Sequence, residues 1–126
     1  MNLRKIDRLV AEKVMGWRLK SFPGEGGGFS AWLNDDEKII KYENNCTLHA
    51  QPYDFWKPST NIADAWQVVK KFYEKGDKVI VTNTLGGNWC CYIHAGLGQF
   101  SAIAETAPLA ICLAAMKACG IEVKTE

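Results

Sequence analysis

The stretch TNTLGGNWCCYIHAGLGQF, residues 82–100, decides the fold of this chain. Two glycine-containing turns enclose the run NWCCYIHA, which is rich in aromatic and apolar residues. Short runs of this kind between turn residues are typical of β-strands. With KVIVTNTL before it and QFSAIAE after it, the stretch predicts a three-stranded antiparallel meander over residues 78–105.

The two turns set the expected register of the meander. A two-residue turn of a primed type at Gly86 and Gly87 predicts these opposite pairs: Leu85 with Asn88, Thr84 with Trp89, Thr82 with Cys91 and Ile80 with Ile93. A four-residue loop at residues 95–98 predicts three more: Ile93 with Phe100, Cys91 with Ala102 and Trp89 with Ala104. Because side chains alternate along a strand, this register assigns each residue to one face of the sheet.

The two faces of the predicted meander differ in chemistry. The face expected to pack on helices holds Ile80, Thr82, Thr84, Trp89, Cys91, Ile93, Phe100, Ala102 and Ala104. The second face mixes apolar and polar residues, and holds Val79, Val81, Asn83, Cys90, Tyr92, His94, Ser101 and Ile103. Such a mixture is typical of a binding or subunit surface. The alternative is a covering helix that satisfies the polar atoms.

Three further segments predict helices. Apolar residues recur at helical spacing from Leu3 to Trp17, and Gly16 offers a stop. The segment from Asn61 to Gly76 begins with a capping residue, and we expect one apolar face in the core: Ile62, Ala65, Trp66, Val69, Phe72 and Tyr73. Residues 106–120 are apolar nearly all round, which predicts the most buried helix.

The part between the first two helices is expected to hold strands and loops. FSAWLN and KIIKYE read as strands, which we expect to join the meander of residues 78–105 in an antiparallel sheet packed with about three helices. The glycines of FPGEGGG precede a strand rather than a helix, which favours a hairpin connection over a phosphate-binding loop. Residues 44–61 lack periodicity but hold Tyr53, Phe55 and Trp56. Long loops of this kind are often functional, and the alternative is that the rings fill the edge of the core.

Length and charge limit the classes of function. A chain of 126 residues, 48% hydrophobic, fits a single domain over residues 1–126 with an α+β fold. A net charge of +1 provides no broad field for DNA, RNA or anionic lipid. The absence of a long apolar run and the odd count of five cysteines predict a reduced protein of the host cell cytoplasm, without a membrane segment.

Two C-x-x-H spacings raise the question of a metal site. Cys46 with His49 and Cys91 with His94 would supply four ligands of the type that zinc prefers. Residues three apart on a regular strand point to opposite faces, which argues against Cys91 and His94 binding one ion. Cys90 and His94 share a face but lie roughly 13 Å apart along a strand, too far for a nucleophile and its base. We therefore predict no metal, no cofactor and no enzymatic activity.

Three segments resemble one protein family. IDRLVAEKVMGW, PSTNIADAWQVVKKF and AETAPLAICLAAMKA are similar, in order and spacing, to the phage ABA sandwich domain family. The resemblance implies a phage or prophage origin and a sheet covered by helices, and it brings no catalytic residues. By origin and size the chain is also similar to the Thoeris anti-defence proteins, oligomers that sequester a cyclic nucleotide-derived immune signal.

This analogy leads to a functional hypothesis with a rival. The hypothesis is a homo-oligomeric counter-defence protein that sequesters a host cyclic nucleotide, with rings stacking on a base and polar groups binding the rest of the ligand. The residues expected to bind it are Arg18, Tyr53, Trp56, Asn83, Asn88, Tyr92 and His94. The rival is a protein-binding module that inhibits a host factor or serves phage assembly without a small ligand.

Overall fold

A computed structural model describes residues 2–24, 28–43 and 55–121. Its helical elements are α1 (Leu3–Leu9), which continues as a π-helical turn, η1 (Val10–Val14), then α2 (Ile62–Glu74) and α3 (Ala107–Ala118). Its strands are β1 (Arg18–Phe22), β2 (Phe29–Leu33), β3 (Ile39–Tyr42), β4 (Lys78–Asn83), β5 (Trp89–Ala95) and β6 (Gly98–Ala104). The predicted α+β class and the three predicted helices are confirmed.

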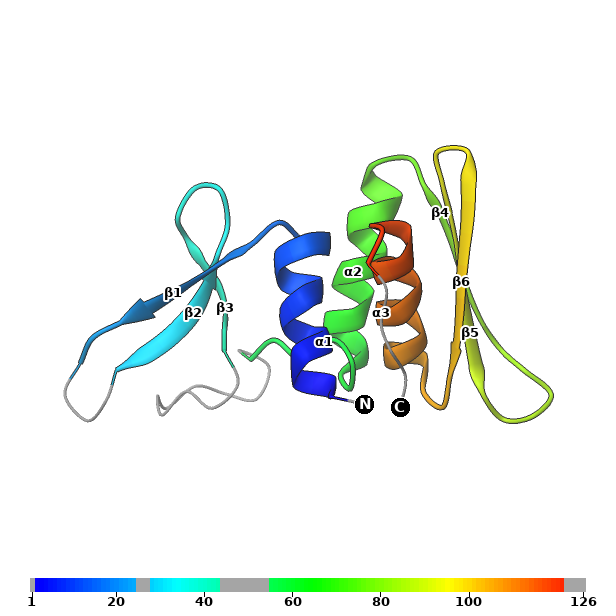
Figure 1. Ribbon diagram of the computed structural model, residues 1–126, viewed down its shortest axis with the longest axis horizontal. Coiled ribbons are helices and arrows are strands. Elements are labelled where there is room, and N and C mark those ends of the chain that lie inside the picture. Colours follow the sequence, from blue (N-terminus) through cyan, green and yellow to red (C-terminus); the bar gives the residue numbers. More distant parts are fainter. Residues whose placement is uncertain (1, 25–27, 44–54, 122–126) are drawn as a thin grey trace.

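The strands form two separate antiparallel sheets, ordered β1-β2-β3 and β4-β5-β6, so the strands before α2 make a sheet of their own instead of joining the meander. Figure 1 shows the three helices side by side in the middle of the molecule, with one sheet on either side of them. Helix α3 packs on β5 and β6, whereas α2 lies over β4 and beside α3. Strands β1 and β2 pair antiparallel, as expected for the hairpin that the sequence predicts.

Side-chain caps start all three helices. The side chains of Asn2, Asn61 and Thr106 accept hydrogen bonds from the backbone N–H groups of Lys5, Asp64 and Leu109, respectively. Each bond satisfies a donor that has no partner within its own helix. As predicted, α3 is the most buried helix, because every side chain from Ala110 to Met116 is enclosed.

The core lies between the helices and extends to one face of each sheet. Its largest enclosed side chains are Ile6, Val10, Trp32, Trp56, Val68, Phe72, Cys91, Ile93, Ile111, Cys112 and Met116. Trp56 contacts Trp17 edge to face, with ring centroids 4.6 Å apart. Of the two interpretations of the aromatic loop, the structure therefore supports core packing for Trp56.

The predicted register is right for β5 and β6 but wrong by one residue for β4. Trp89 lies opposite Ala104 and Ile93 opposite Phe100, as expected. However, Val81 rather than Thr82 lies opposite Cys91. The β4–β5 loop has three residues, because Thr84 N donates to Asn88 O and only Gly87, at φ +84°, adopts a left-handed conformation.

The extra loop residue exchanges the two faces of β4. Val79, Val81 and Asn83 now lie opposite Ile93, Cys91 and Trp89, on the side toward the helices. Ile80 and Thr82 lie opposite Tyr92 and Cys90, on the other side. The expected positions of Asn83, Ile80 and Thr82 are corrected accordingly.

Helix α2 also differs from the expectation. Its buried side chains are Asp64, Ala65, Val68 and Phe72. Trp66, which we expected in the core, is 58% exposed, and Tyr73 is 65% exposed. The helix carries two apolar stripes, and the one with the smaller residues faces the core. Among the described residues, no helix is long and apolar enough to cross a membrane.

Candidate functional site

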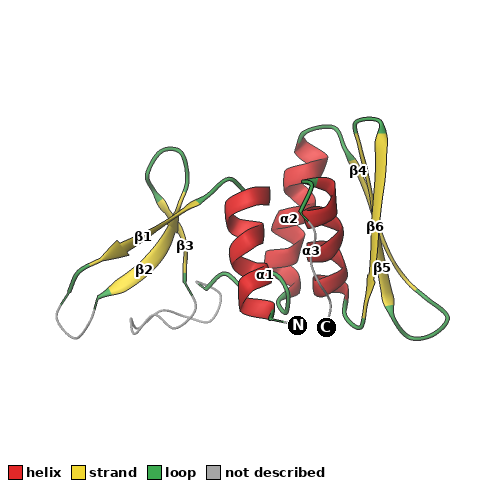
Figure 2. Cartoon of the chain, in the orientation of Figure 1, coloured by secondary structure: helices red, strands yellow, loops and turns green. Residues whose placement is uncertain are grey.

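One face of the β4-β5-β6 sheet is left open. Figure 2 shows the helices on one side of this sheet and no described element on the other. Three cross-strand rows make up this open face: Lys78, His94 and Gln99; Ile80, Tyr92 and Ser101; Thr82, Cys90 and Ile103. Only Cys90 is buried and Tyr92 half-buried, whereas the other seven residues are exposed.

The open face offers one aromatic ring surrounded by hydrogen-bonding groups. The Tyr92 phenol lies at the centre of the face, between Ile80 and Ser101. Its interaction with the neighbouring Cys90 thiol raises the pKa of Tyr92, so the phenol stays a hydrogen-bond donor at neutral pH. Lys78 places an ammonium group in the next row. The surface can stack a planar ligand and bind an anion beside it.

Two buried thiols, Cys91 on β5 and Cys112 on α3, are poor nucleophiles. Burial, together with neighbouring Cys90, raises the pKa of Cys91 to about 12. Burial raises the pKa of Cys112 well above its usual value, with smaller contributions from the charges of Asp7, Cys91 and Asp64. Because the thiolate is the reactive form, neither thiol is activated at neutral pH.

The possible zinc ligands do not converge in the described part of the chain. Cys91 is fully buried on the helix side of β5, whereas His94 is exposed on the open face. Cys46 and His49 lie outside the described residues. Within residues 2–24, 28–43 and 55–121, no three His, Cys, Asp or Glu side chains form a group that could hold a metal ion.

The residues predicted to bind a ligand do not form one site. Tyr92 and His94 lie on the open face. Asn83 lies on the opposite face, and Asn88 lies in the adjoining turn region. Arg18 belongs to the other sheet, where its guanidinium pairs with Glu37 at 3.1 Å.

Of the remaining two predicted residues, the structure describes only Trp56, which is not available to a ligand on the open face. Trp56 is 1% exposed, and its Nε1 donates to the Asp7 carbonyl oxygen at 3.1 Å. Its ring faces are therefore enclosed by the core, which corrects the expectation that Trp56 stacks on a base. Tyr53 lies outside the described residues.

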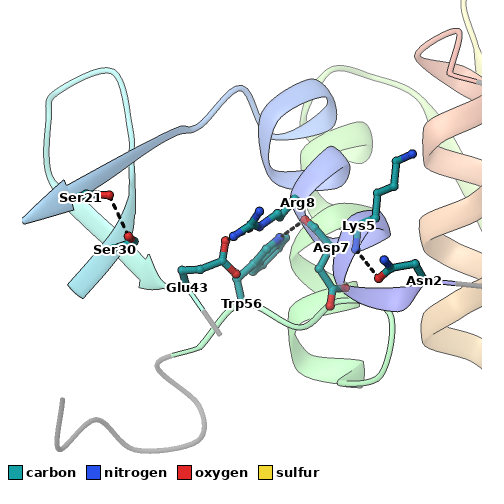
Figure 3. Close-up of polar contacts among 8 residues, drawn as sticks. All are labelled: Asn2, Lys5, Asp7, Arg8, Ser21, Ser30, Glu43 and Trp56. Atoms are coloured by element: carbon teal, nitrogen blue, oxygen red, sulfur yellow. Dashed lines mark hydrogen bonds and ion pairs between the residues drawn. The ribbon is translucent and has the colours of Figure 1, made fainter. Parts of the chain in front are cut away.

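Sequence reasoning missed a cluster of buried acids near α1, part of which Figure 3 shows. Asp7 Oδ1 accepts from Ser59 N at 2.8 Å, and Asp64 Oδ2 accepts from Lys57 N at 2.9 Å. Two ion pairs complete the cluster: Arg8 with Glu43 at 2.8 Å and Lys41 with Asp64 at 3.2 Å. These bonds hold residues 57–59 against α1 and the start of α2.

Burial raises the pKa of Asp7 to about 6. The hydrogen bonds with Ser59 oppose the rise, and the negative charges of Asp64 and Glu43 add to it. The carboxyl group is nevertheless enclosed and bonded to the backbone. We therefore assign it a structural role.

A groove between α2 and β4 was also missed. It has a volume of about 640 Å³ and is lined by Trp66, Val69, Lys70, Tyr73, Asp77, Lys78 and Val79. The helical spacing of Trp66, Val69 and Tyr73 was visible in the sequence. The sequence did not show that these residues are exposed, and we had assigned them to the core.

The sequence model of the Phage ABA sandwich domain matches residues 8–116, most of the chain. The chain belongs to the phage ABA sandwich domain family. A phage protein from Bacillus cereus has a solved structure that is similar to this one, with a TM-score of 0.67 and 27% sequence identity. The match covers 98% of this chain and 93% of that chain.

Membership of the phage ABA sandwich domain family confirms the resemblance found in the sequence. It also agrees with the sheet and helix layers described above. None of the curated proteins matches this chain. Membership of the family establishes the architecture of this phage protein but names no ligand. The surfaces of the protein are therefore the guide to what it binds.

Proposed function

We propose that this phage protein is a non-catalytic binding protein that captures a small nucleotide on its open face. The observation that carries the proposal is that Tyr92 lies on the open face, in the cross-strand row next to the one that holds Lys78 and His94. Tyr92 stacks on the base, and the Lys78 ammonium binds a phosphate. The buried, protonated thiols Cys91 and Cys112 favour binding over nucleophilic chemistry.

The nucleotide we propose is a cyclic immune signal of the host. The phage family and the small size of the chain support a counter-defence role, by analogy with anti-defence proteins that sequester such signals. Sequestration needs tight binding but no turnover. One stacked base contributes about 1 to 3 kcal/mol, so further hydrogen bonds from the open face are required for tight binding.

Thermal unfolding with a panel of cyclic nucleotides tests the proposal. A ligand at a hundredfold its dissociation constant adds about 2.7 kcal/mol to the free energy of unfolding, which raises the melting temperature by several degrees. Tyr92→Ala should weaken the affinity about tenfold to a hundredfold. The matched control, Tyr73→Ala, removes an exposed ring from α2 and should leave the affinity unchanged.

Two outcomes would contradict the proposal. One is a panel in which no nucleotide moves the melting curve. The other is a ligand whose affinity is equally affected by Tyr92→Ala and Tyr73→Ala, because its site would then not be the open face.

A second candidate function is supported by a different observation. Ile62, Trp66 and Tyr73 on α2 and Ile103 on the open face are all more than half exposed. Exposed apolar groups of this size are typical of surfaces that bind another protein. A module that inhibits a host factor or serves phage assembly would use such a surface, and it would not respond to nucleotides.

A further inference from the structure

Helix α2 has a second apolar stripe that is mostly exposed, with only Val69 packed partly against the core. Ile62, Trp66, Val69 and Tyr73 follow one another at intervals of four, three and four residues. Ile62, Trp66 and Tyr73 are 53%, 58% and 65% exposed. Alternating intervals of three and four give the seam along which one helix packs on another. The other stripe, Ala65, Val68 and Phe72, already packs in the core.

The stripe lies beside the free edge of a regular strand. In the order β4-β5-β6, strand β4 pairs with only one described strand. Its six residues, Lys78–Asn83, include no proline or glycine, and they pair with β5 without a register shift. Such an edge presents unpaired N–H and C=O groups that can add another strand. Trp66, Val69 and Tyr73 of the stripe line one groove with Lys78 and Val79 of this edge.

We propose that this surface joins two copies of the chain in a twofold dimer. The β4 strands pair antiparallel and extend the two sheets into one of six strands, while the two α2 stripes pack against each other. The twofold axis runs perpendicular to the sheet, because only this direction keeps both α2 helices on the same side.

The symmetry also limits the register of the two β4 strands. Residues that lie opposite each other must point to the same face, so the pairing is centred on Ile80 or on Val81. A centre at Ile80 places Val79 of each copy opposite Val81 of the other, on the side that α2 covers. This arrangement continues the apolar layer beneath the helices from one copy to the next.

The available area fits a second copy. An aromatic side chain buries roughly 150 to 250 Å² when fully enclosed, so the exposed parts of Trp66, Tyr73 and Ile62 offer on the order of 400 Å² per copy. The edge of β4 and the rest of the groove add to this. The three side chains alone therefore supply about half of the roughly 800 Å² that each partner contributes to a standard interface.

A second copy of this chain is favoured over another protein as the partner, because the surface has two features that one partner must match at the same time. The partner has to supply a strand for the β4 edge and an apolar helix above that strand. A second copy supplies both at the required spacing by symmetry. Tyr92 lies on the other side of the sheet, and Lys78 borders both surfaces. The dimer is argued from the α2 stripe and the β4 edge and does not rest on the proposed function.

The mass of the protein in solution tests the dimer. Light scattering after size-exclusion chromatography, with protein loaded at about 100 μM, should give twice the mass of the 126-residue chain. The double variant Trp66→Glu, Tyr73→Glu should give the mass of one chain, because a buried pair of carboxylates on each stripe repels its copy. Ile103→Glu is the matched control, since Ile103 is 62% exposed but lies on the open face. It should remain a dimer.

Hydrogen exchange supplies a second measurement that separates loss of the dimer from loss of folding. The amides of β4 that face its free edge should be protected in the wild-type dimer and exchange faster in the double variant. The amides of β5 and α3 should be protected equally in both. A wild-type protein that has the mass of one chain at this concentration would overturn the proposal. So would a dimer that survives the double variant or is broken by Ile103→Glu.

Discussion

At the scale of single residues, Asp7 links the stability of the protein to pH. Its pKa is raised from 3.8 to about 6, mainly by burial. Between these two values the folded state holds a proton that the unfolded state has lost. Folding therefore gains stability as the pH falls through about 6, and it loses this contribution as the pH rises through about 6.

The variant Asp7→Asn isolates this effect. Its amide oxygen can still accept the hydrogen bond from Ser59 N, but the side chain does not titrate near neutral pH. We expect the stability of the wild type, measured against Asp7→Asn by urea unfolding, to fall as the pH rises from about 4 to about 6 and to stay level above that. A constant difference over this range would show that Asp7 titrates near its ordinary pKa in the folded state.

The two tryptophans Trp32 and Trp66 provide a residue-scale test of the core. Trp32 is fully buried, so Trp32→Ala should lower the free energy of unfolding by about 3 to 5 kcal/mol. Trp66→Ala should cost less than about 1 kcal/mol per protomer, because the ring is mostly exposed. Chemical unfolding at low protein concentration makes the comparison independent of self-association. Similar losses in the free energy of unfolding of the two variants would show that Trp66 is a core residue.

At the scale of elements, the β4–β5 hairpin determines which side chains reach the open face. Only Gly87 has a positive φ in this turn, and the register depends on its three-residue loop. Gly87→Ala should destabilise the protein by about 1 kcal/mol or more, because a side chain disfavours this conformation. Gly86→Ala is the control and should be tolerated, since an added Cβ would come no closer than 4.0 Å to Thr84 Oγ1.

The measurement is thermal or urea unfolding of the two variants. A two-residue turn of a primed type with positive φ at both glycines would make both substitutions costly. The structure predicts a cost at Gly87 alone. Equal losses of stability in the two variants would therefore support the register expected from the sequence, in which Asn83 lies on the open face.

The elements also show why sequence reasoning reached only part of the structure. Asn61 and Thr106 predicted helix starts correctly, because a cap is a local interaction. The sequence around Gly86 and Gly87 suits both a two-residue and a three-residue loop, so the register of β4 was decided by one ambiguous turn. The face expected for α2 combined residues of its two apolar stripes: Ala65 and Phe72 are buried as expected, whereas Ile62, Trp66 and Tyr73 are exposed.

At the scale of the whole molecule, the fold class, the helices and the family were predictable, but the candidate site was predictable only in part. The open face exists, and Tyr92 and His94 lie on it as expected. Arg18 and Trp56 do not, because their positions depend on contacts between distant segments, such as Trp56 Nε1 with the Asp7 carbonyl oxygen. Such long-range contacts leave no periodic signal in a single sequence.

The contacts of the first helix with α3 also constrain how the molecule is made. The first helix contacts α3, close to the other end of the described chain, as well as residues 56 and 59. A nascent chain that emerges from the ribosome therefore cannot complete this packing until the last helix has been synthesised. Assembly of the N-terminal helix is the closing event rather than the opening one, and truncation before α3 would leave that helix without its main docking site.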